Sequence, residues 1–270
     1  MNLRLDLAYN GAPFRGFARQ NDVRTVQGDV DAALGRLVGS AVNSTGAGRT
    51  DAGVHALGQV MTVPELPDDL DLTRVKDSLN GMLGPAISIS GCKAADPGFN
   101  ARFSARSRTY FYAILESEVP DPFLAGTALW HRRSLDVDAM NEAAGHLAGE
   151  HDWSSFGRVE PDRPAVRDLF ELRCARDGRI LRVRARANAF LQQMVRSLVG
   201  TLVYVGEGRR SPDEVPGILA ARDRAAAGPV APPHGLCLVS VEYDEGWSLP
   251  VMPDRVLEPR RPGRTSRPNS

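Results

Sequence analysis

The sequence has little lysine, little cysteine and no long hydrophobic run. Only two of its 33 basic residues are lysines, Lys76 and Lys93, so arginine carries almost all of the positive charge. The three cysteines, Cys92, Cys174 and Cys237, lie far apart and form no C-x-x-C pair, which argues against a disulfide framework or a zinc site. No stretch approaches the roughly 20 apolar residues of a membrane-spanning helix, and the N-terminus lacks the apolar core of a signal peptide. We therefore expect a cytoplasmic protein that does not associate with membranes.

Several common catalytic motifs are also absent. A dinucleotide fingerprint begins at Gly46-x-Gly48 but reaches Asp51 where it needs a third glycine, and that carboxylate would face a pyrophosphate. Neither lysine follows a glycine as in a Walker loop, and no G-x-S-x-G elbow for a serine hydrolase is present. The five histidines form no H-E-x-x-H pair. We therefore expect neither a nucleotide cofactor nor a catalytic metal.

Positive and negative charges are equal in number but unevenly distributed. The 33 basic and 33 acidic residues cancel, and a net charge of zero alone argues against a nucleic-acid partner. The segment 173–196, however, holds seven arginines and a single acid. Within it Arg182, Arg184 and Arg186 alternate with apolar residues, which predicts a strand with one arginine face. That face is either solvated or a stripe that contacts phosphates, because three neighbouring guanidinium groups repel one another unless an anion compensates them.

Hydrophobic periodicity predicts a mixture of helices and strands. Strands are expected at 3–9, 59–63, 86–91, 109–116, 169–174, 179–187 and 235–243, and helices at 25–38 (with Gly39 as the stop), 72–82, 136–149, 189–206 and 211–221. Because the order lacks a regular βαβ alternation, it favours an α+β fold with mainly antiparallel sheets. Similar element types recur in the two halves, which suggests subdomains at 1–105 and 106–250. The Pro- and Arg-rich tail 251–270 is expected to be disordered.

The segment "TGAGRTDAGVHALG", from Thr45 to Gly58, is too rich in glycine for a helix and too charged for the core. In an extended loop, residues two apart project to the same side, so the Arg49 guanidinium can clamp the Asp51 carboxylate and hold it ionised. Such a carboxylate serves as a nucleophile or stabilises an oxocarbenium ion. A purely structural salt bridge in a turn is the alternative on these grounds.

The same segment closely resembles the catalytic motif of the tRNA pseudouridine synthase A family. Four further segments resemble the family's motifs in the family's order: "FRGFARQ" (14–20), "FNARFSARSRTYFY" (99–112), "NAFLQQMVRSLVGTL" (188–202) and "GLCLVSVEY" (235–243). Together they extend the resemblance over about residues 1 to 245. The tail lies outside it.

The resemblance assigns roles to individual residues. It makes Asp51 the catalytic nucleophile and Arg49 its ion-pair partner, and Tyr110 the tyrosine that stacks on the target base and takes part in proton transfer. Arg196 would pair with the carboxylate from the second half of the chain, and Leu238 would form an apolar wall of the pocket. An arginine inside an apolar helix is costly to bury unpaired, which independently favours a carboxylate partner for Arg196.

The first motif supplies two expected RNA contacts, Arg15 and Phe17. The resemblance further implies a pseudouridine synthase fold around a central basic cleft, and a cofactor-free isomerase that acts as a homodimer on uridines 38, 39 and 40 of the tRNA anticodon stem-loop. Two other functions fit the residues alone. One is a non-catalytic RNA-binding module with a structural Arg49–Asp51 pair, and the other is a nucleoside glycosidase, which needs a second carboxylate that the motif does not supply.

Overall fold

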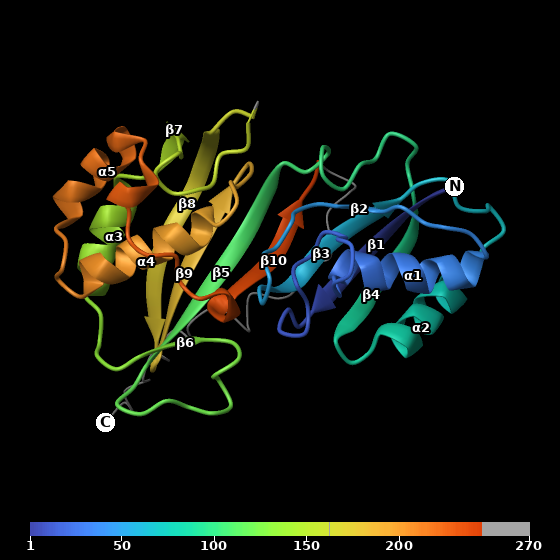
Figure 1. The fold of residues 1–270 in the computed structure, drawn as a ribbon, viewed down its shortest axis with the longest axis horizontal. Coiled ribbons are helices and arrows are strands. Elements are labelled where there is room, and N and C mark those ends of the chain that lie inside the picture. The colour runs from blue at the N-terminus through green and yellow to red at the C-terminus, as the bar shows by residue number, and fades with distance from the viewer. Residues whose placement is uncertain (162, 245–270) are drawn as a thin grey trace, which may run out of the picture.

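The computed structural model describes residues 1–161 and 163–244, and one large sheet crosses the whole molecule (Figure 1). The strands are β1 (Asn2–Tyr9), β2 (Thr45–Gly46), β3 (His55–Val63), β4 (Ile87–Ala95), β5 (Ser107–Glu116), β6 (Leu129–His131), β7 (Gly149–Asp152), β8 (Val166–Asp177), β9 (Ile180–Ala187) and β10 (Leu236–Glu242). The helices are α1 (Val26–Val38), α2 (Leu72–Leu83), α3 (Val137–Gly145), α4 (Met194–Gly206) and α5 (Val215–Ala221), with short 3-10 turns at Pro212–Glu214, Arg224–Ala226 and Pro233–Gly235.

The strands follow the order β4-β1-β3-β10-β5-β9-β8-β7, with β2 paired to β3 and β6 to β5. The pairs β10–β3 and β5–β6 are parallel and the other pairs are antiparallel. Helices α1 and α2 accompany the half with β1–β4, and α3–α5 accompany the half with β7–β9 (Figure 1). The predicted α+β class with a mainly antiparallel sheet is confirmed.

The last strand holds the two halves together. Strand β10 lies between β3 and β5, so that Leu238 is in register with Ala56 on one side and with Tyr110 on the other. The predicted boundary near residue 105 falls just before β5, and the sheet runs through it without a break. The division into two subdomains therefore stays a prediction, and the tail 251–270 lies outside the described residues.

Local sequence signals account for most element boundaries. Helix α1 begins where the Thr25 side chain accepts a hydrogen bond from the Gly28 amide, and it ends at Gly39, whose φ of 75° is left-handed; both are typical cap signals. At the N-terminus of helix α2, the Asp71 side chain accepts hydrogen bonds from the Thr73 and Arg74 amides in the same way. The alternation predicted for β9 is confirmed, because Leu181, Val183, Ala185 and Ala187 are each 0% exposed whereas the arginines between them are half-buried.

Two predicted helices are too long. Helix α4 begins at Met194 rather than at residue 189, because Gln193 adopts a left-handed backbone (φ 64°) and Gln192 forms a β-bridge with Arg158. Residues 189–193 are therefore a loop. Helix α3 ends at Gly145 instead of residue 149, where the unpredicted strand β7 begins.

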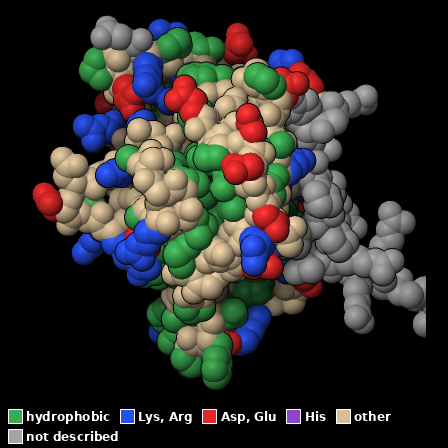
Figure 2. Space-filling model, turned by 90° about the vertical axis from the view of Figure 1, so that its right-hand side faces the viewer, with side chains coloured by type: hydrophobic (Ala, Val, Ile, Leu, Met, Phe, Trp, Pro, Cys, Tyr) green, Lys and Arg blue, Asp and Glu red, His purple; other side chains and the backbone are tan. Residues whose placement is uncertain are grey.

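The outer surface of the N-terminal half carries both signs of charge. Figure 2 faces this end of the molecule and shows acidic and basic side chains interspersed across it. Among the described residues, no helix is both long enough and apolar enough to span a bilayer.

Candidate active site

The glycine-rich segment forms a loop between β2 and β3, with Asp51 at its turn. The Val54 amide donates to the Asp51 carbonyl at 3.1 Å and closes this turn. The neighbouring Thr50 side chain is buried and shares a 2.8 Å hydrogen bond with the Tyr9 hydroxyl. This inward contact anchors the loop, while the Asp51 side chain stays 21% exposed.

Arg196, in the first turn of α4, is the ion-pair partner of Asp51. Its Nη1 lies 2.9 Å from Asp51 Oδ2, across a sequence separation of 145 residues. Its Nε donates to the Ala231 carbonyl at 2.7 Å, and the Ala231 amide donates back to the Arg196 carbonyl at 3.0 Å. The guanidinium is thus fixed on one side by main chain and presents its other side to the carboxylate.

The predicted clamp between Arg49 and Asp51 is not among the ion pairs of the residues described, and on this point the prediction from spacing is wrong. The Arg49 side chain is exposed and lines the cleft described below. The physical reason is that the chain turns at Asp51 instead of continuing as an extended strand, so that two-residue spacing does not bring the two side chains together.

Tyr110 lies on β5 and faces the same cleft. Its side chain is 7% exposed, and its ring meets that of Phe190 edge-on with centroids 5.3 Å apart. No hydrogen bond of the described residues involves the Tyr110 hydroxyl, and a Cβ added at Gly48 would stand 3.6 Å from it. Burial raises the pKa of Tyr110 well above its usual range, so the hydroxyl keeps its proton and can donate a hydrogen bond.

The segment containing Gly16 and Phe17 supports the Asp51 loop from behind. The Phe17 amide donates to the Thr50 carbonyl at 3.0 Å. Gly16 has a left-handed φ of 109°, and a Cβ there would approach the Thr50 carbonyl to 3.2 Å. The Phe17 ring is 2% exposed and packs so closely on Gly46 that an added Cβ would lie 2.3 Å from it. With almost none of its ring exposed, Phe17 positions the loop backbone rather than offering a face for an RNA base.

Two other expected site residues lie at different depths. Arg15 is exposed and lines the cleft, where it can reach a ligand. Leu238 is 0% exposed, lies beside Tyr110 on the adjacent strand β10 and is absent from the cleft lining; Leu236, two residues earlier, lines the cleft instead.

His55 ties the end of the loop to two other segments. The Gly11 amide donates to its Nδ1 at 3.1 Å, and its Nε2 lies 3.0 Å from the Gly126 carbonyl. Because an amide can only donate, Nδ1 is the acceptor and the ring is neutral, with its proton on Nε2. Burial lowers the pKa of His55.

These residues surround a cleft of about 960 Å³ with a strongly basic lining. Of the described residues that line it, two are acidic, Asp51 and Glu160. The arginines that line it are Arg15, Arg19, Arg49, Arg102, Arg108, Arg158, Arg163, Arg167 and Arg196. The part of the chain described contains no group of three His, Cys, Asp or Glu side chains placed to hold a metal ion.

Sequence patterns missed most of this basic lining. Arg158, Arg163 and Arg167 lie in "GRVEPDRPAVRDL", which has no helical or strand periodicity. The recurrence of arginine in a segment without periodicity is the signal that could have indicated this lining, although Arg167 itself lies at the start of β8.

The arginine stripe of β9 lies outside the cleft. Each guanidinium pairs with a carboxylate of the protein itself: Arg182 with Asp177 at 3.3 Å, Arg184 with Glu171 at 3.0 Å and Arg186 with Glu242 at 3.1 Å. These acids, brought close by the fold, supply the compensation for which the prediction invoked RNA phosphates. The reason for assigning phosphate contacts to this stripe is thereby removed.

Comparison with known proteins places the chain among enzymes that modify tRNA. A family model described as tRNA pseudouridine synthase matches residues 143–244. The tRNA pseudouridine synthase A of Frankia casuarinae is 47% identical over 247 residues, covering 90% of this chain and 89% of that protein. The protein of the same name from Burkholderia vietnamiensis is 42% identical over 251 residues, covering 93% of each. A chain in the crystal structure of the archaeal box H/ACA sRNP Nop10–Cbf5 complex is 14% identical, with a TM-score of 0.34 over 76% of this chain and 44% of that one.

Proposed function

The chain belongs to the tRNA pseudouridine synthase A family, and on that premise we propose that it isomerises uridines 38, 39 and 40 of the tRNA anticodon stem-loop with Asp51 as the nucleophile. Membership makes it an isomerase that forms pseudouridine in tRNA. The target positions and the role of Asp51 are the proposed part.

The observation that carries the proposal is the ion pair between Asp51 and Arg196 within an arginine-lined cleft. The pair joins the loop after β2 to the first turn of α4. It orients a partly exposed carboxylate toward space that is large enough for a nucleotide. Reactive groups held in a fixed geometry lower the barrier by removing the entropy of alignment.

The reaction rearranges the uridine without a net gain or loss of atoms. The bond from C1′ to N1 breaks, the uracil turns, and C1′ bonds to C5; the hydrogen at C5 leaves as a proton and N1 takes one up. No electron is transferred to another molecule. Attack of Asp51 at C1′, its addition to C6, and elimination to a glycal each use the carboxylate at this position.

Tyr110 is suited to hold the displaced base. Extruding a nucleotide from a helix costs a few kcal/mol, and stacking on an aromatic ring returns roughly 1–3 kcal/mol. The free, protonated hydroxyl of Tyr110 adds a hydrogen-bond donor within the cleft, next to Gly48.

The cleft arginines are suited to bind the RNA backbone. Burial, followed by the neighbouring charges of Arg163 and Arg49, lowers the pKa of Arg102, and burial followed by Arg163 has the same effect on Arg167. A cluster of cations that repel one another gains from an anionic ligand. Stem RNA is read mainly through its shape, backbone and 2′-hydroxyls, so phosphate contacts position the substrate without requiring a fixed sequence.

Substitution of Asp51 tests the catalytic assignment. Unmodified tRNA transcript is incubated with the wild type, with Asp51→Asn, and with Asp29→Asn as a control for an acid of α1 outside the cleft. Pseudouridine is then mapped by carbodiimide treatment and primer extension. We expect modification at positions 38–40 by the wild type and by Asp29→Asn, and none by Asp51→Asn although it still binds tRNA. Full activity of Asp51→Asn refutes the assignment, and wild-type modification confined to other positions refutes the proposed target.

Charge substitutions test the RNA-binding surface. Each of Arg49→Gln and Arg102→Gln removes one cleft cation that no carboxylate of the described residues pairs with, so each should weaken tRNA binding and reduce the slope of log affinity against log salt by about 0.7 to 0.9. Arg182→Gln and Arg184→Gln serve as controls, because their guanidinium groups are already paired within the protein. Equal effects from the two sets would place the binding surface elsewhere.

A homodimer in the cytoplasm completes the proposal. The dimer is implied by the family resemblance, and a reducing compartment agrees with three free cysteines. Sedimentation of the full chain measures the oligomeric state, and fractionation of cells measures the location.

A further inference from the structure

Arg108 is a buried cation whose hydrogen bonds all go to main-chain carbonyls. Its side chain extends from β5 and the residue is 8% exposed. Nε and Nη2 both donate to the Ala47 carbonyl, at 3.2 and 2.9 Å. Nη1 donates to Ala105 at 3.2 Å and to Asn188 at 2.7 Å, and Nη2 also donates to Arg102 at 2.6 Å. Five bonds use the five N–H groups of the guanidinium.

The four acceptors belong to three separate segments of the cleft wall. Ala47 lies four residues before Asp51, in the loop between β2 and β3. Arg102 and Ala105 lie in the connection from β4 to β5, and Asn188 opens the loop that leads to α4 and Arg196. One planar side chain therefore fixes the spacing among the Asp51 loop, the Arg102 segment and the entry to α4.

Packing alone gives little reason to keep a charge at this place. Among the described residues, no carboxylate forms an ion pair with Arg108, and burial lowers the pKa of its guanidinium. A buried charge is retained at a cost in stability unless hydrogen bonds compensate it. Here the compensation comes entirely from loop carbonyls, and the side chain lies two residues from Tyr110 on the same face of β5.

We propose that Arg108 is a positioning residue for the isomerisation: it holds the Asp51 loop and the entry to α4 at the separation in which Asp51 meets Arg196. This inference rests on the proposed function. It assigns Arg108 no contact with substrate, because its N–H groups are already occupied within the protein.

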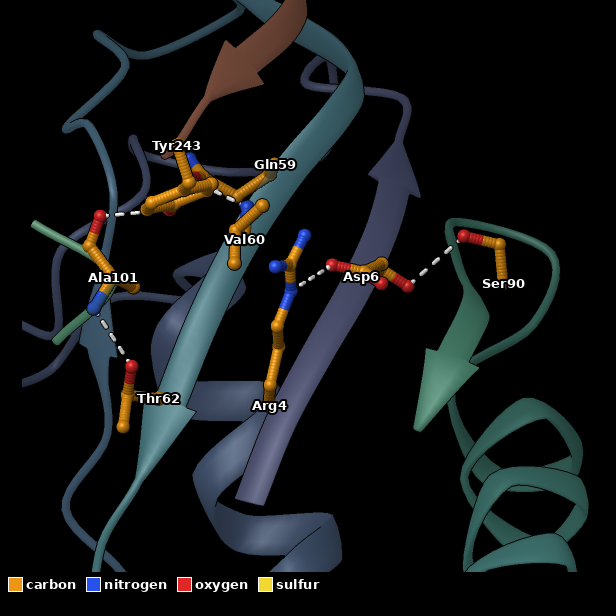
Figure 3. A network of polar contacts seen from close by, with 8 residues as sticks. All are labelled: Arg4, Asp6, Gln59, Val60, Thr62, Ser90, Ala101 and Tyr243. Atoms are coloured by element: carbon orange, nitrogen blue, oxygen red, sulfur yellow. Dashed lines mark hydrogen bonds and ion pairs between the residues drawn. The ribbon is translucent and has the colours of Figure 1, made fainter. Parts of the chain in front are cut away.

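A second buried arginine provides a matched control. Arg4, on β1, is 1% exposed, and its Nε donates to Asp6 at 2.8 Å (Figure 3). Its guanidinium also lies about 5 Å from the ring centroids of Phe99 and Tyr243. None of these residues lines the cleft. Arg4 therefore shares the burial and charge of Arg108. Of the three segments that Arg108 joins, Arg4 contacts the β4–β5 connection, at Phe99, so that the matched comparison rests on residues 47–54 and 188–193.

The test compares Arg108→Met, Arg108→Lys and Arg4→Met in the full chain. Four quantities are measured: the thermal midpoint, amide hydrogen exchange resolved by peptide, the single-turnover rate with saturating tRNA, and the tRNA dissociation constant. For Arg108→Met we expect faster exchange confined to residues 47–54, 99–106 and 188–193. We expect a rate about 100-fold lower, the order of loss that an ångström-scale misplacement of catalytic groups causes.

The lysine variant separates geometry from charge. Lysine keeps the positive charge but presents it at one point, so it cannot span carbonyls from three segments. We expect Arg108→Lys to bind tRNA as the wild type does and to react nearly as slowly as Arg108→Met. Arg4→Met should lower the thermal midpoint and leave the single-turnover rate unchanged.

Several outcomes overturn the proposal. A wild-type rate in Arg108→Lys would mean that charge alone matters, and exchange that rises equally in β1 and β3 would reduce Arg108 to a general stabiliser. Should Arg108→Met fail to fold, the lysine variant carries the test. Should the wild type fail to modify tRNA, the proposed function falls, whereas the exchange pattern still decides whether Arg108 holds the loops.

Discussion

The ion pair between Asp51 and Arg196 should be worth measurable stability, and a double-mutant cycle isolates its contribution. Asp51→Asn removes one charge and preserves shape, and Arg196→Met removes the other and preserves length. The two single variants and the double variant are compared with the wild type by urea denaturation, followed through the fluorescence of the buried Trp153. The bond from Arg196 to Ala231 is lost in both Asp51 backgrounds, so it cancels from the coupling energy.

The expected magnitude follows from distance and burial. The charged atoms are 2.9 Å apart, and the side chains of Arg196 and Asp51 are 13% and 21% exposed. Full charges about 4 Å apart attract by about 4 kcal/mol at an effective dielectric constant of 20. The free-energy cost of removing the two charges from water offsets part of this attraction. A hydrogen bond to a charged group contributes about 1.5–3 kcal/mol net, and we expect a coupling energy in that range.

A second arginine–aspartate ion pair, with a similar N–O distance but more exposed side chains, provides the control. Arg24 and Asp29 are 2.8 Å apart, with side chains 53% and 28% exposed. Water screens such a pair, so the cycle built from Arg24→Met and Asp29→Asn should give less than about 1 kcal/mol. A coupling near zero for Asp51 and Arg196, or equal values for the two pairs, would refute the reasoning that the fold holds this carboxylate by burial and charge together.

Three further predictions concern the surroundings of the site. Gly46→Ala places a Cβ 2.3 Å from the Phe17 ring, so it should lower the free energy of unfolding in urea by about 1–3 kcal/mol. The control Gly81→Ala, at an open position of α2, should raise that free energy by up to about 1 kcal/mol. A Gly46→Ala variant as stable as the wild type contradicts the packing argument. Burial lowers the pKa of His55, so the contribution of the neutral ring to stability is fully present above its unfolded pKa of about 6.5 and is lost as pH falls through the folded value. The thermal midpoint of the wild type should therefore fall more between about pH 7.5 and about pH 5 than that of His55→Gln. Equal falls in the two proteins would exclude this linkage. Tyr110→Phe keeps the ring but removes the proton donor, so the single-turnover rate should drop about 100-fold at an unchanged thermal midpoint, whereas unchanged kinetics would leave Tyr110 as a stacking platform alone.

Local patterns in the sequence predicted local structure well. The alternation in β9, the stop at Gly39 and the strand that carries Tyr110 all depend on residues within a few positions of one another. Periodicity was misleading just before α4, where Phe190 and Leu191 continue an apolar helical pattern and yet line the cleft as a loop. The left-handed backbone at Gln193 and the bridge from Arg158 override the pattern there, and both depend on tertiary contacts.

Long-range pairing could not be read from the residues alone. The apolar run at 235–243 indicates a strand but carries no information about its neighbours, so its insertion between β3 and β5 was not predicted. The partner of Asp51 shows the same limit. Spacing favoured Arg49, two residues away, whereas the fold supplies Arg196 from another element, the residue that family resemblance had indicated.

Arginine has three separable roles in this chain, which explains why neither its abundance nor the zero net charge identifies the RNA surface. In β9 it pairs with carboxylates on the sheet, and such pairs contribute nothing to binding an anion from outside. Arg108 uses its planar fork to join carbonyls of three segments, a task for which lysine has the wrong geometry. Besides Arg108, six arginines line the cleft without an ion pair within the described ranges: Arg15, Arg19, Arg49, Arg102, Arg158 and Arg167. Within the cleft, these are the charges that we expect a phosphate to meet, so the proposed binding surface follows from which cleft arginines the fold leaves without carboxylates rather than from where arginines are most frequent in the sequence.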